Sequence, residues 1–291
     1  MPKLLKWIAI LLGSLIAVLV IAVGSLTLLS VSHQRRTHDI APEQLVIPAA
    51  GDRAAGEHYV QVGCVGCHGP DLGGQQFFND GKMGHLWSRN LTKGEGGIGR
   101  SFTRADWVRA LRYGVAPDGR TLLMMPTNAF EHLPDEDLAN IIAYLDSVPP
   151  VDRVIPAPRV GPLARILSVL TPFPLFSAEQ VEANAVRTKP PESDTLAYGG
   201  YLAEVAGCHE CHGTNLGNGA VGPNITPGGK LAGWTEADFF KALREGKRPD
   251  GTTITDEMPW KDFRRLTDGE LNALWRYVHS VPPVVPKAKK P

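Results

Sequence analysis

Residues 64–68 read CVGCH, and residues 208–212 read CHECH. These two segments contain all four cysteines of the 291-residue chain, and in each the Cys-x-x-Cys pair is followed at once by a histidine. A Cys-x-x-Cys pair can be a thiol redox couple, half of a zinc site, or an attachment point for haem. The residues around the two segments distinguish these possibilities.

The histidine after each pair favours haem. Only nine of the 291 residues are histidine, so two chance histidines at this position would be rare. A zinc site made from both pairs would leave these histidines unexplained, and a thioredoxin-like couple needs a βαβ context, whereas the flanks here are glycine-rich. Cys-x-x-Cys-His is the attachment pattern of c-type haem, so we expect two covalently bound haem c groups.

The spacing gives each residue of the motif a role. Two thioether bonds hold the porphyrin edge, and the imidazole of the next residue then lies under the iron as an axial ligand. The expected anchors are Cys64, Cys67, Cys208 and Cys211, and the expected iron ligands are His68 and His212. His209 lies between two anchors, where it cannot reach the same iron, so we expect its side chain to be exposed.

An apolar segment at residues 7–31 contains 25 positions without a charge. As a helix rising about 1.5 Å per residue it exceeds a hydrocarbon core of roughly 30 Å, and it is too long for a buried core helix. A cleaved secretory signal has an apolar region of about 7–15 residues. We therefore expect an uncleaved membrane anchor. Its orientation is not set by charge, because Lys3 and Lys6 are balanced by Arg35 and Arg36.

The second half of the chain repeats the first. The matched segments are GEHYVQVGCVGCHGPDLGG with GGYLAEVAGCHECHGTNLG, NLT at 90–92 with NIT at 224–226, FTRADWVRALRYG at 102–114 with WTEADFFKALREG at 234–246, and DLANIIAYLDSVPPV at 137–151 with ELNALWRYVHSVPPV at 270–284. Each repeat predicts a helix, the cysteine motif, a glycine-rich loop, a middle helix, a loop and a terminal helix with one apolar stripe. The paired Asn-x-Thr triplets indicate a structural loop. The first repeat alone contains an insert at 75–87.

A Met-Pro step precedes the terminal helix of each repeat, at Met125 and at Met258. Methionine as sixth ligand raises the potential of a haem and closes its iron to small molecules. A single methionine is ordinarily a core gap-filler, but two matched steps beside two haem motifs predict that Met125 and Met258 are iron ligands. For the first haem, Met124, Met83 and His85 are the alternatives.

With these residues in view, the chain resembles a membrane-anchored dihaem cytochrome c built from two class I cytochrome c domains, over residues 51–286. It is also similar to the cytochrome subunits of periplasmic dehydrogenases, which often carry three haems where this chain has two motifs. The resemblance implies an all-α fold, with an N-terminal transmembrane helix followed by two tandem domains. Because c-type cytochromes acquire haem outside the cytoplasm, it also implies that residues 32–291 are periplasmic.

These observations divide the chain into six parts. We expect an anchor at 1–31, a linker at 32–50, a first cytochrome domain at 51–150, a proline-rich connector at 151–191, a second domain at 192–286 and a tail at 287–291. The connector contains the apolar stretch VGPLARILSVLTPFPLF at 160–176. Three roles remain open for it: a place on the membrane surface, a partner contact, or filling the seam between the domains.

The expected function is electron transfer rather than catalysis. We expect a single-pass protein of a bacterial inner membrane, carrying electrons between a dehydrogenase or respiratory complex and a downstream acceptor. Thirty basic residues balance thirty acidic ones, so no net charge points to a nucleic acid as partner. The rival function is a dihaem peroxidase-like enzyme with one open haem, and the two Met-Pro steps argue against it.

Overall fold

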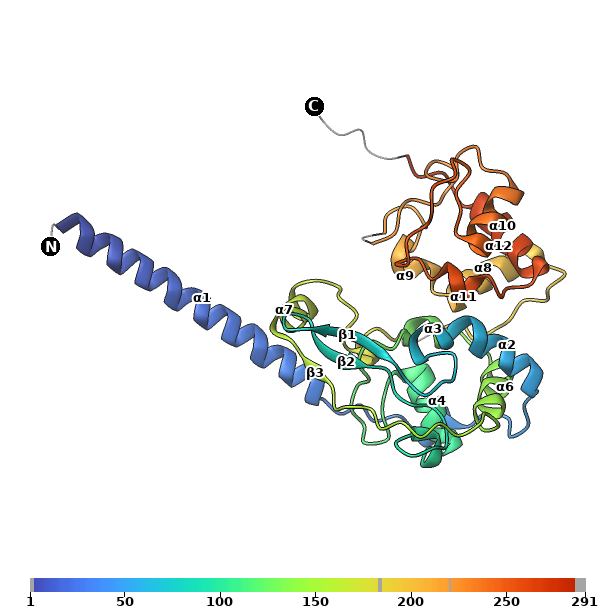
Figure 1. Ribbon diagram of the computed structural model, residues 1–291, viewed down its shortest axis with the longest axis horizontal. Helices are drawn as coiled ribbons and strands as arrows, with labels where there is room; N and C mark the ends of the chain where they lie inside the picture. The colour runs from blue at the N-terminus through green and yellow to red at the C-terminus, as the bar shows by residue number, and fades with distance from the viewer. Residues whose placement is uncertain (1–2, 183–184, 220, 286–291) are drawn as a thin grey trace.

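The computed structural model describes residues 3–182, 185–219 and 221–285, so the tail expected at 287–291 lies outside the described residues. A long helix, α1 (Lys3–Arg35), projects from the first of two helical units, and a connector joins the two units (Figure 1). The helix begins four residues before the predicted span 7–31 and ends four residues after it. Its apolar window is fully exposed, and it is long and apolar enough to cross a membrane. A cleaved signal sequence has the same features.

The first unit follows the predicted order of helices. After the short helix η1 (Pro42–Leu45) come α2 (Arg53–Gly63), α3 (Val65–His68), η2 (Ile98–Arg100), α4 (Arg104–Tyr113), α5 (Thr127–Phe130) and α6 (Asp135–Leu145). Its core contains Val60, Val108 and Leu138, which are completely buried. These residues come from the lead-in, middle and terminal helices, so one core joins the three predicted helices.

The second unit repeats this arrangement. Its elements are α8 (Thr195–Val205), α9 (Cys208–His212), α10 (Glu236–Glu245), α11 (Trp260–Phe263) and α12 (Asp268–Ser280). The middle helices even begin alike, because Thr103 and Thr235 each form a capping box with the aspartate three residues later. Helices dominate both units, which confirms the expected all-α class.

A glycine brings the first and last helices of each unit together. A side chain at Gly56 in α2 would collide with the backbone of Asn140 in α6, and one at Gly199 in α8 would collide with the backbone of Ala273 in α12. Such close contact of two helix backbones requires a residue without Cβ. The lead-in helices of the two domains therefore pack in the same way.

The insert of the first repeat forms an element that the helical repeat did not predict. Strands β1 (Gln76–Asp80) and β2 (Gly84–Trp87) make an antiparallel hairpin, and β3 (Arg159–Val160) from the connector pairs with β2. The connector continues into α7 (Pro162–Leu170) and η3 (Ser177–Glu179). Leu86, Leu175 and Phe176 form a small separate core between the hairpin and the connector. The apolar part of the connector thus packs on the insert and on α1.

The two units contact each other through equivalent residues. His58 of α2 lies 2.8 Å from Glu270 of α12, and the Tyr201 hydroxyl of α8 donates to Asp137 of α6 at 2.9 Å. His58 and Tyr201 each follow the contact glycine by two residues, and Asp137 and Glu270 are matched in the repeat. The same pairing is therefore made twice, once in each direction, as in an interface with two-fold symmetry.

Candidate functional site

Each cysteine motif forms one helical turn at the end of its lead-in helix. Cys64 closes α2, and the amide of His68 donates to the Cys64 carbonyl at 2.9 Å. Residues three and four apart lie on the same side of a helix, so Cys67 and His68 lie on the same side as Cys64. Gly69, with φ of 81°, ends the turn. The motif of the second unit forms α9 and ends in the same way, at Gly213 with φ of 82°.

The environment of the cysteines does not suit thiol redox chemistry or zinc. Burial raises the pKa of Cys64 and of Cys208 to about 12, and it also raises the pKa of Cys67 and Cys211. A redox couple needs a thiolate, which a lowered pKa provides. Across residues 3–182, 185–219 and 221–285, no cluster of three or more His, Cys, Asp or Glu side chains could hold a metal ion. The attachment of haem to these pairs stays the prediction of their sequence.

The two histidines are oriented by a backbone carbonyl. His68 Nδ1 lies 2.8 Å from the Arg89 carbonyl, and His212 Nδ1 lies 2.7 Å from the Pro223 carbonyl. A carbonyl only accepts hydrogen bonds, so Nδ1 carries the proton in both rings and Nε2 keeps a free lone pair. Burial lowers the pKa of both imidazoles, which keeps them neutral. A neutral imidazole with a free Nε2 is what an iron ligand requires.

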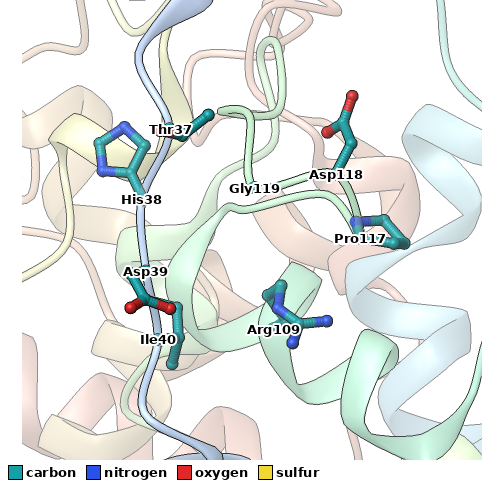
Figure 2. Close-up of a pocket in the computed structure, with 8 residues that line it drawn as sticks. All are labelled: Thr37, His38, Asp39, Ile40, Arg109, Pro117, Asp118 and Gly119. Carbon is teal, nitrogen blue, oxygen red and sulfur yellow. The ribbon is translucent and has the colours of Figure 1, made fainter.

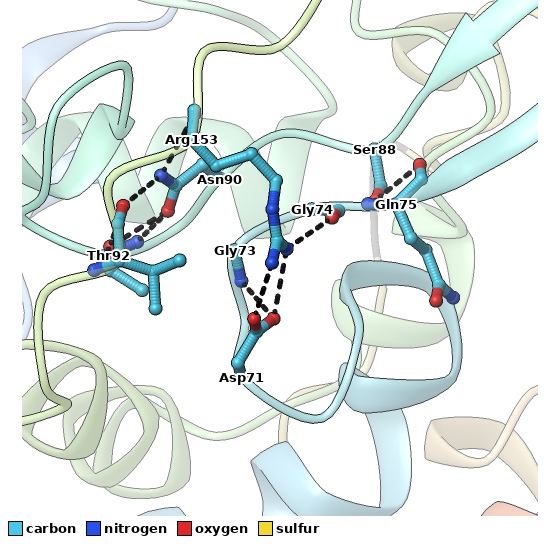
Figure 3. Close-up of polar contacts among 9 residues, drawn as sticks. Asp71, Gly73, Gly74, Gln75, Ser88, Asn90, Thr92 and Arg153 are labelled. Carbon is cyan, nitrogen blue, oxygen red and sulfur yellow. Dashed lines mark hydrogen bonds and ion pairs between the residues drawn. The ribbon is translucent and has the colours of Figure 1, made fainter.

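An asparagine directly after each of these carbonyls fixes the loop that carries it. The Asn90 Nδ2 group donates to the Val151 carbonyl at 2.7 Å, and Asn90 Oδ1 accepts from the amide and the hydroxyl of Thr92, both at 2.9 Å (Figure 3). In the second unit Asn224 donates to Val284 at 2.6 Å and accepts from Thr226. These bonds tie the loop behind each histidine to the chain after the terminal helix, which confirms the structural role of the Asn-x-Thr triplets.

The adjacent methionines of the first unit belong to different cores. Met125 packs against the main core of this unit, whereas Met124 packs with the separate core of Leu86, Leu175 and Phe176. Met124 has φ of 59°, a left-handed backbone conformation. Met258 packs against the core of the second unit, as Met125 does in the first.

The alternatives to Met125 in the insert have other surroundings. Met83 lies at the turn of the hairpin, and His85 is exposed on β2 with its Nδ1 atom 2.6 Å from Asn79 Oδ1. The structure therefore places neither residue in the main core with Met125.

The expected exposure of His209 was wrong. Its side chain is only 12 % exposed and lies 3.3 Å from Glu204 Oε1. The ring also packs edge-on against Tyr277 of the terminal helix, with 6.5 Å between ring centroids. The local spacing of the motif could not indicate this contact, because the fold brings Tyr277 to the motif.

Buried donors beside the methionines fit a bound haem. Thr127 Oγ1 and Trp260 Nε1 are buried, and neither has a hydrogen-bond partner within the described part of the chain. Both residues stand two positions after the methionine of a Met-Pro step. Unpaired buried donors are costly, and the propionates of a haem are acceptors for such groups. The donor set near Met125 and Met258 therefore suits this cofactor.

Comparison with known proteins assigns both units to cytochrome families. Residues 53–149 match the family described as Cytochrome c, and residues 199–278 match the family described as Cytochrome C oxidase, cbb3-type, subunit III. Each match contains one Cys-x-x-Cys-His motif. The chain is a dihaem cytochrome c.

Relatives of this dihaem cytochrome include subunits of dehydrogenases. It is 29 % identical to the fructose dehydrogenase cytochrome subunit of Gluconobacter japonicus, over 77 % of this chain and 52 % of the relative. It is 28 % identical to the cytochrome c subunit of the quinone alcohol dehydrogenase of Gluconacetobacter polyoxogenes, over 79 % and 56 %. A diheme cytochrome c-type protein of Cereibacter sphaeroides is 28 % identical over 83 % of this chain and 90 % of its own length. The chain thus spans about half the length of the two dehydrogenase subunits.

These matches confirm the expected class, a cytochrome with two covalently bound haem c groups. They give no support to the peroxidase-like alternative. Sequence reasoning missed the carbonyls of Arg89 and Pro223 that orient the histidines. The available signal was the repeated Asn-x-Thr triplet that directly follows both.

The structure has two cavities to consider. The first contains none of the predicted haem residues in its lining, and the second contains Cys64. One, of about 310 Å³, separates the chain that leaves α1 from the first domain, and Figure 2 shows its lining. Its walls are Thr37, His38, Asp39, Ile40, Arg109, Pro117, Asp118 and Gly119, none of which is a predicted haem residue. The other, of about 40 Å³, lies between the domains and includes Cys64 and Glu270 in its lining. It belongs to the seam beside the first haem motif.

Proposed function

We propose that this dihaem cytochrome carries electrons on the periplasmic face of the membrane, from a dehydrogenase or respiratory complex to a downstream acceptor. The names of its relatives support a dehydrogenase as the donor, because they are cytochrome subunits of fructose and alcohol dehydrogenases. Each bound haem supplies one iron that alternates between the ferrous and ferric states. The chain supplies the ligands of both irons and the interface that brings the two haems together.

The proposed iron ligands are His68 with Met125 in the first domain and His212 with Met258 in the second. The matched hydrogen bond from each histidine Nδ1 atom to a backbone carbonyl carries the histidine assignment, and the matched Met-Pro steps carry that of the methionines. It fixes the ring and increases the basicity of Nε2. Two axial side chains leave no open position for peroxide or oxygen, so the site suits a carrier rather than a catalyst.

The seam between the domains supports electron transfer from one haem to the other. Each cysteine motif lies against the short helix after the Met-Pro step of the other domain. Asp262 of α11 occupies the space where Gly66 would carry a side chain, and Asn128 of α5 donates to Glu210 of α9. Gly66 and Glu210 are equivalent positions between the two cysteines. The attachment edges of both haems thus lie at one interface.

The anchor completes the proposal. We infer that α1 is retained as a single span of a bacterial inner membrane, and that residues 51–150 and 192–286 are the two periplasmic cytochrome domains. The 25 uncharged positions at 7–31 support retention, because the apolar region of a cleaved signal has only about 7–15 residues. Tethering raises the local concentration of the cytochrome around membrane-bound partners.

The proposed function can be tested on the protein purified from membranes in mild detergent. We expect a dehydrogenase subunit to co-purify, and its substrate to reduce both haems anaerobically. Subsequent addition of an acceptor should reoxidise them. A high-spin haem that turns over peroxide would instead establish the enzyme function.

A further inference from the structure

Helix α7 of the connector packs along the last turns of α1. Ser168 Oγ lies 3.2 Å from Ser30 Oγ, and the Arg165 guanidinium donates to Gln34 Oε1 at 3.1 Å. Ser30 is completely buried as a result. Figure 1 shows α7 and the hairpin beside the end of α1 that joins the first domain. The connector therefore contacts the anchor at a defined height along it.

This height corresponds to the edge of a bilayer. A hydrocarbon core of roughly 30 Å requires about 20 helical residues, so a span beginning at Trp7 reaches its far side near Leu26. Residues 3–25 of α1 are all exposed, and Leu26 and Thr27 are the first that are partly covered. The surface of α1 is thus bare over the length that lipid would surround and covered where the interface would begin.

The exposed side chains next to the contact between α7 and α1 include large apolar ones. Leu163 is 39 % exposed and Leu170 is 63 % exposed on α7, and Phe77 of the adjoining hairpin is 41 % exposed. The hairpin is joined to α7 directly, because the Leu163 amide donates to the Lys82 carbonyl at 3.0 Å. Arg165 is the one charged residue of α7, and it is directed to Gln34 of α1. Short helices with exposed apolar side chains bind by burying them at the boundary of headgroups and acyl chains.

We propose that α7, together with Phe77, lies in the outer lipid interface and forms a second membrane contact of the chain. This proposal rests on the proposed retention of α1. The bilayer is the occupant because the exposed apolar side chains surround the point where the anchor leaves the hydrocarbon. The contact holds the first cytochrome domain against the membrane, so that the domain cannot turn freely about a single helix.

Site-directed nitroxide labelling of the full chain, with both haems, in phosphatidylcholine vesicles tests the proposal. Single substitutions Leu170→Cys and Leu163→Cys place the label on α7, because the four native cysteines are bonded to haem. Leu15→Cys in α1, 55 % exposed, is the lipid control, and Leu196→Cys in the second domain, 47 % exposed, is the aqueous control. Relaxation by oxygen and by a water-soluble nickel chelate reports the surroundings of each label.

We expect the labels at positions 170 and 163 to be relaxed by oxygen and protected from nickel, as at position 15. The label at 196 should show the reverse. Labels on α7 that nickel reaches, while position 15 remains protected, overturn this inference and leave the anchor intact. Labels protected from both reagents show that protein covers α7, a second copy or a partner, and overturn it too. Access of nickel to position 15 refutes the anchor itself.

Discussion

His58 Nε2 lies 2.8 Å from Glu270 Oε1, although the two residues are 212 positions apart and belong to different cytochrome domains. The reverse contact joins Tyr201 to Asp137. Tyr59 and Lys189 also contact Asp137, at 2.6 and 3.7 Å. The interface therefore contains one pair that can change its charge near neutral pH and one cluster held by tyrosine hydroxyls. From this difference between the two halves we expect the docking of the domains to depend on pH.

Docking should weaken as the pH rises through the pKa of His58. The hydrogen bond to Glu270 raises the pKa of His58, against the opposing effects of burial and of Lys189. A histidine whose pKa is higher in the folded protein stabilises it fully at pH values below its unfolded pKa of about 6.5. This stabilisation is lost as the pH rises through the pKa in the folded protein. Burial alone would raise the pKa of Glu270, but the bonds from His58 and Thr267 outweigh it and the net shift is downward. The contribution of Glu270 to the stability of the docked domains is therefore lost only at acidic pH.

Hydrogen exchange of α2 and α12 between pH 5 and pH 9 measures this dependence. In the unmodified protein, the protection of amides in α2 and α12 should fall as the pH rises above the pKa of His58. In His58→Gln this fall should be absent. Tyr201→Phe is the matched control, because it weakens the other half of the interface without removing the histidine. The same alkaline step in His58→Gln would show that another group controls docking.

Asn90→Ala should destabilise the first domain and disturb its histidine. The substitution removes the 2.7 Å bond to the part-buried Val151 carbonyl and the oxygen that accepts from the Thr92 amide and hydroxyl, which costs about 1–3 kcal/mol. Because Asn90 follows the carbonyl that orients His68, the reduction potential of the first haem should change as well. Asn224→Ala should have the equivalent effect on the second domain. Guanidinium unfolding and a redox titration measure both properties.

The matched control for this prediction is Asn79→Ala, whose side chain contacts His85 on the exposed hairpin. It should change neither the unfolding midpoint nor the potential. An unchanged unfolding midpoint in Asn90→Ala would mean that water replaces the lost hydrogen bonds and that the loop does not depend on Asn90.

Much of the fold and of the site was predictable because the information is local. The spacing of Cys64, Cys67 and His68 is that of one helical turn, and the repeated segments define the order of helices in both domains. The hairpin at 76–87 had a local signal in the turn residues Asp80 and Gly81, but its partner strand β3 comes from the distant connector. The charged ends of α1 were excluded from the predicted span because they do not belong in hydrocarbon, yet a helix continues into water without difficulty.

The remainder depends on contacts between distant segments. His58 and Glu270 meet only because the two domains dock, and no pattern within either repeat specifies the docked orientation. The burial of His209 depends in the same way on Tyr277. Repetition in the sequence shows which positions are equivalent, but it does not show which of them meet across an interface.

Denatured protein should retain two haems for each chain after extraction with acidified acetone. In the proposed assignment, thioether bonds to Cys64 and Cys67 hold one haem and those to Cys208 and Cys211 hold the other, and such bonds survive unfolding. Cys208→Ala with Cys211→Ala should leave one haem. A pyridine haemochrome assay against protein concentration measures the ratio. One haem in the unmodified protein would refute the dihaem assignment.

Met258→Ala tests the proposed axial ligands, since it removes the sixth ligand of the second haem only. The soft thioether favours ferrous iron, so the potential of that haem should fall. Its share of the weak charge-transfer absorption near the red edge of the visible spectrum should disappear, and the iron should begin to bind carbon monoxide. Met125→Ala should do the same to the first haem.

Met124→Ala is the control that the structure provides, because Met124 packs with Leu175 and Phe176 in the separate core. Its removal should lower stability but leave both spectra and both potentials unchanged. If Met124→Ala, Met83→Ala or His85→Ala causes the spectral loss, the ligand of the first haem comes from that position. The division of Met124 and Met125 between two cores would then need a rearrangement when haem binds. Because Met125 packs against the main core and Met124 does not, we expect the loss in Met125→Ala alone.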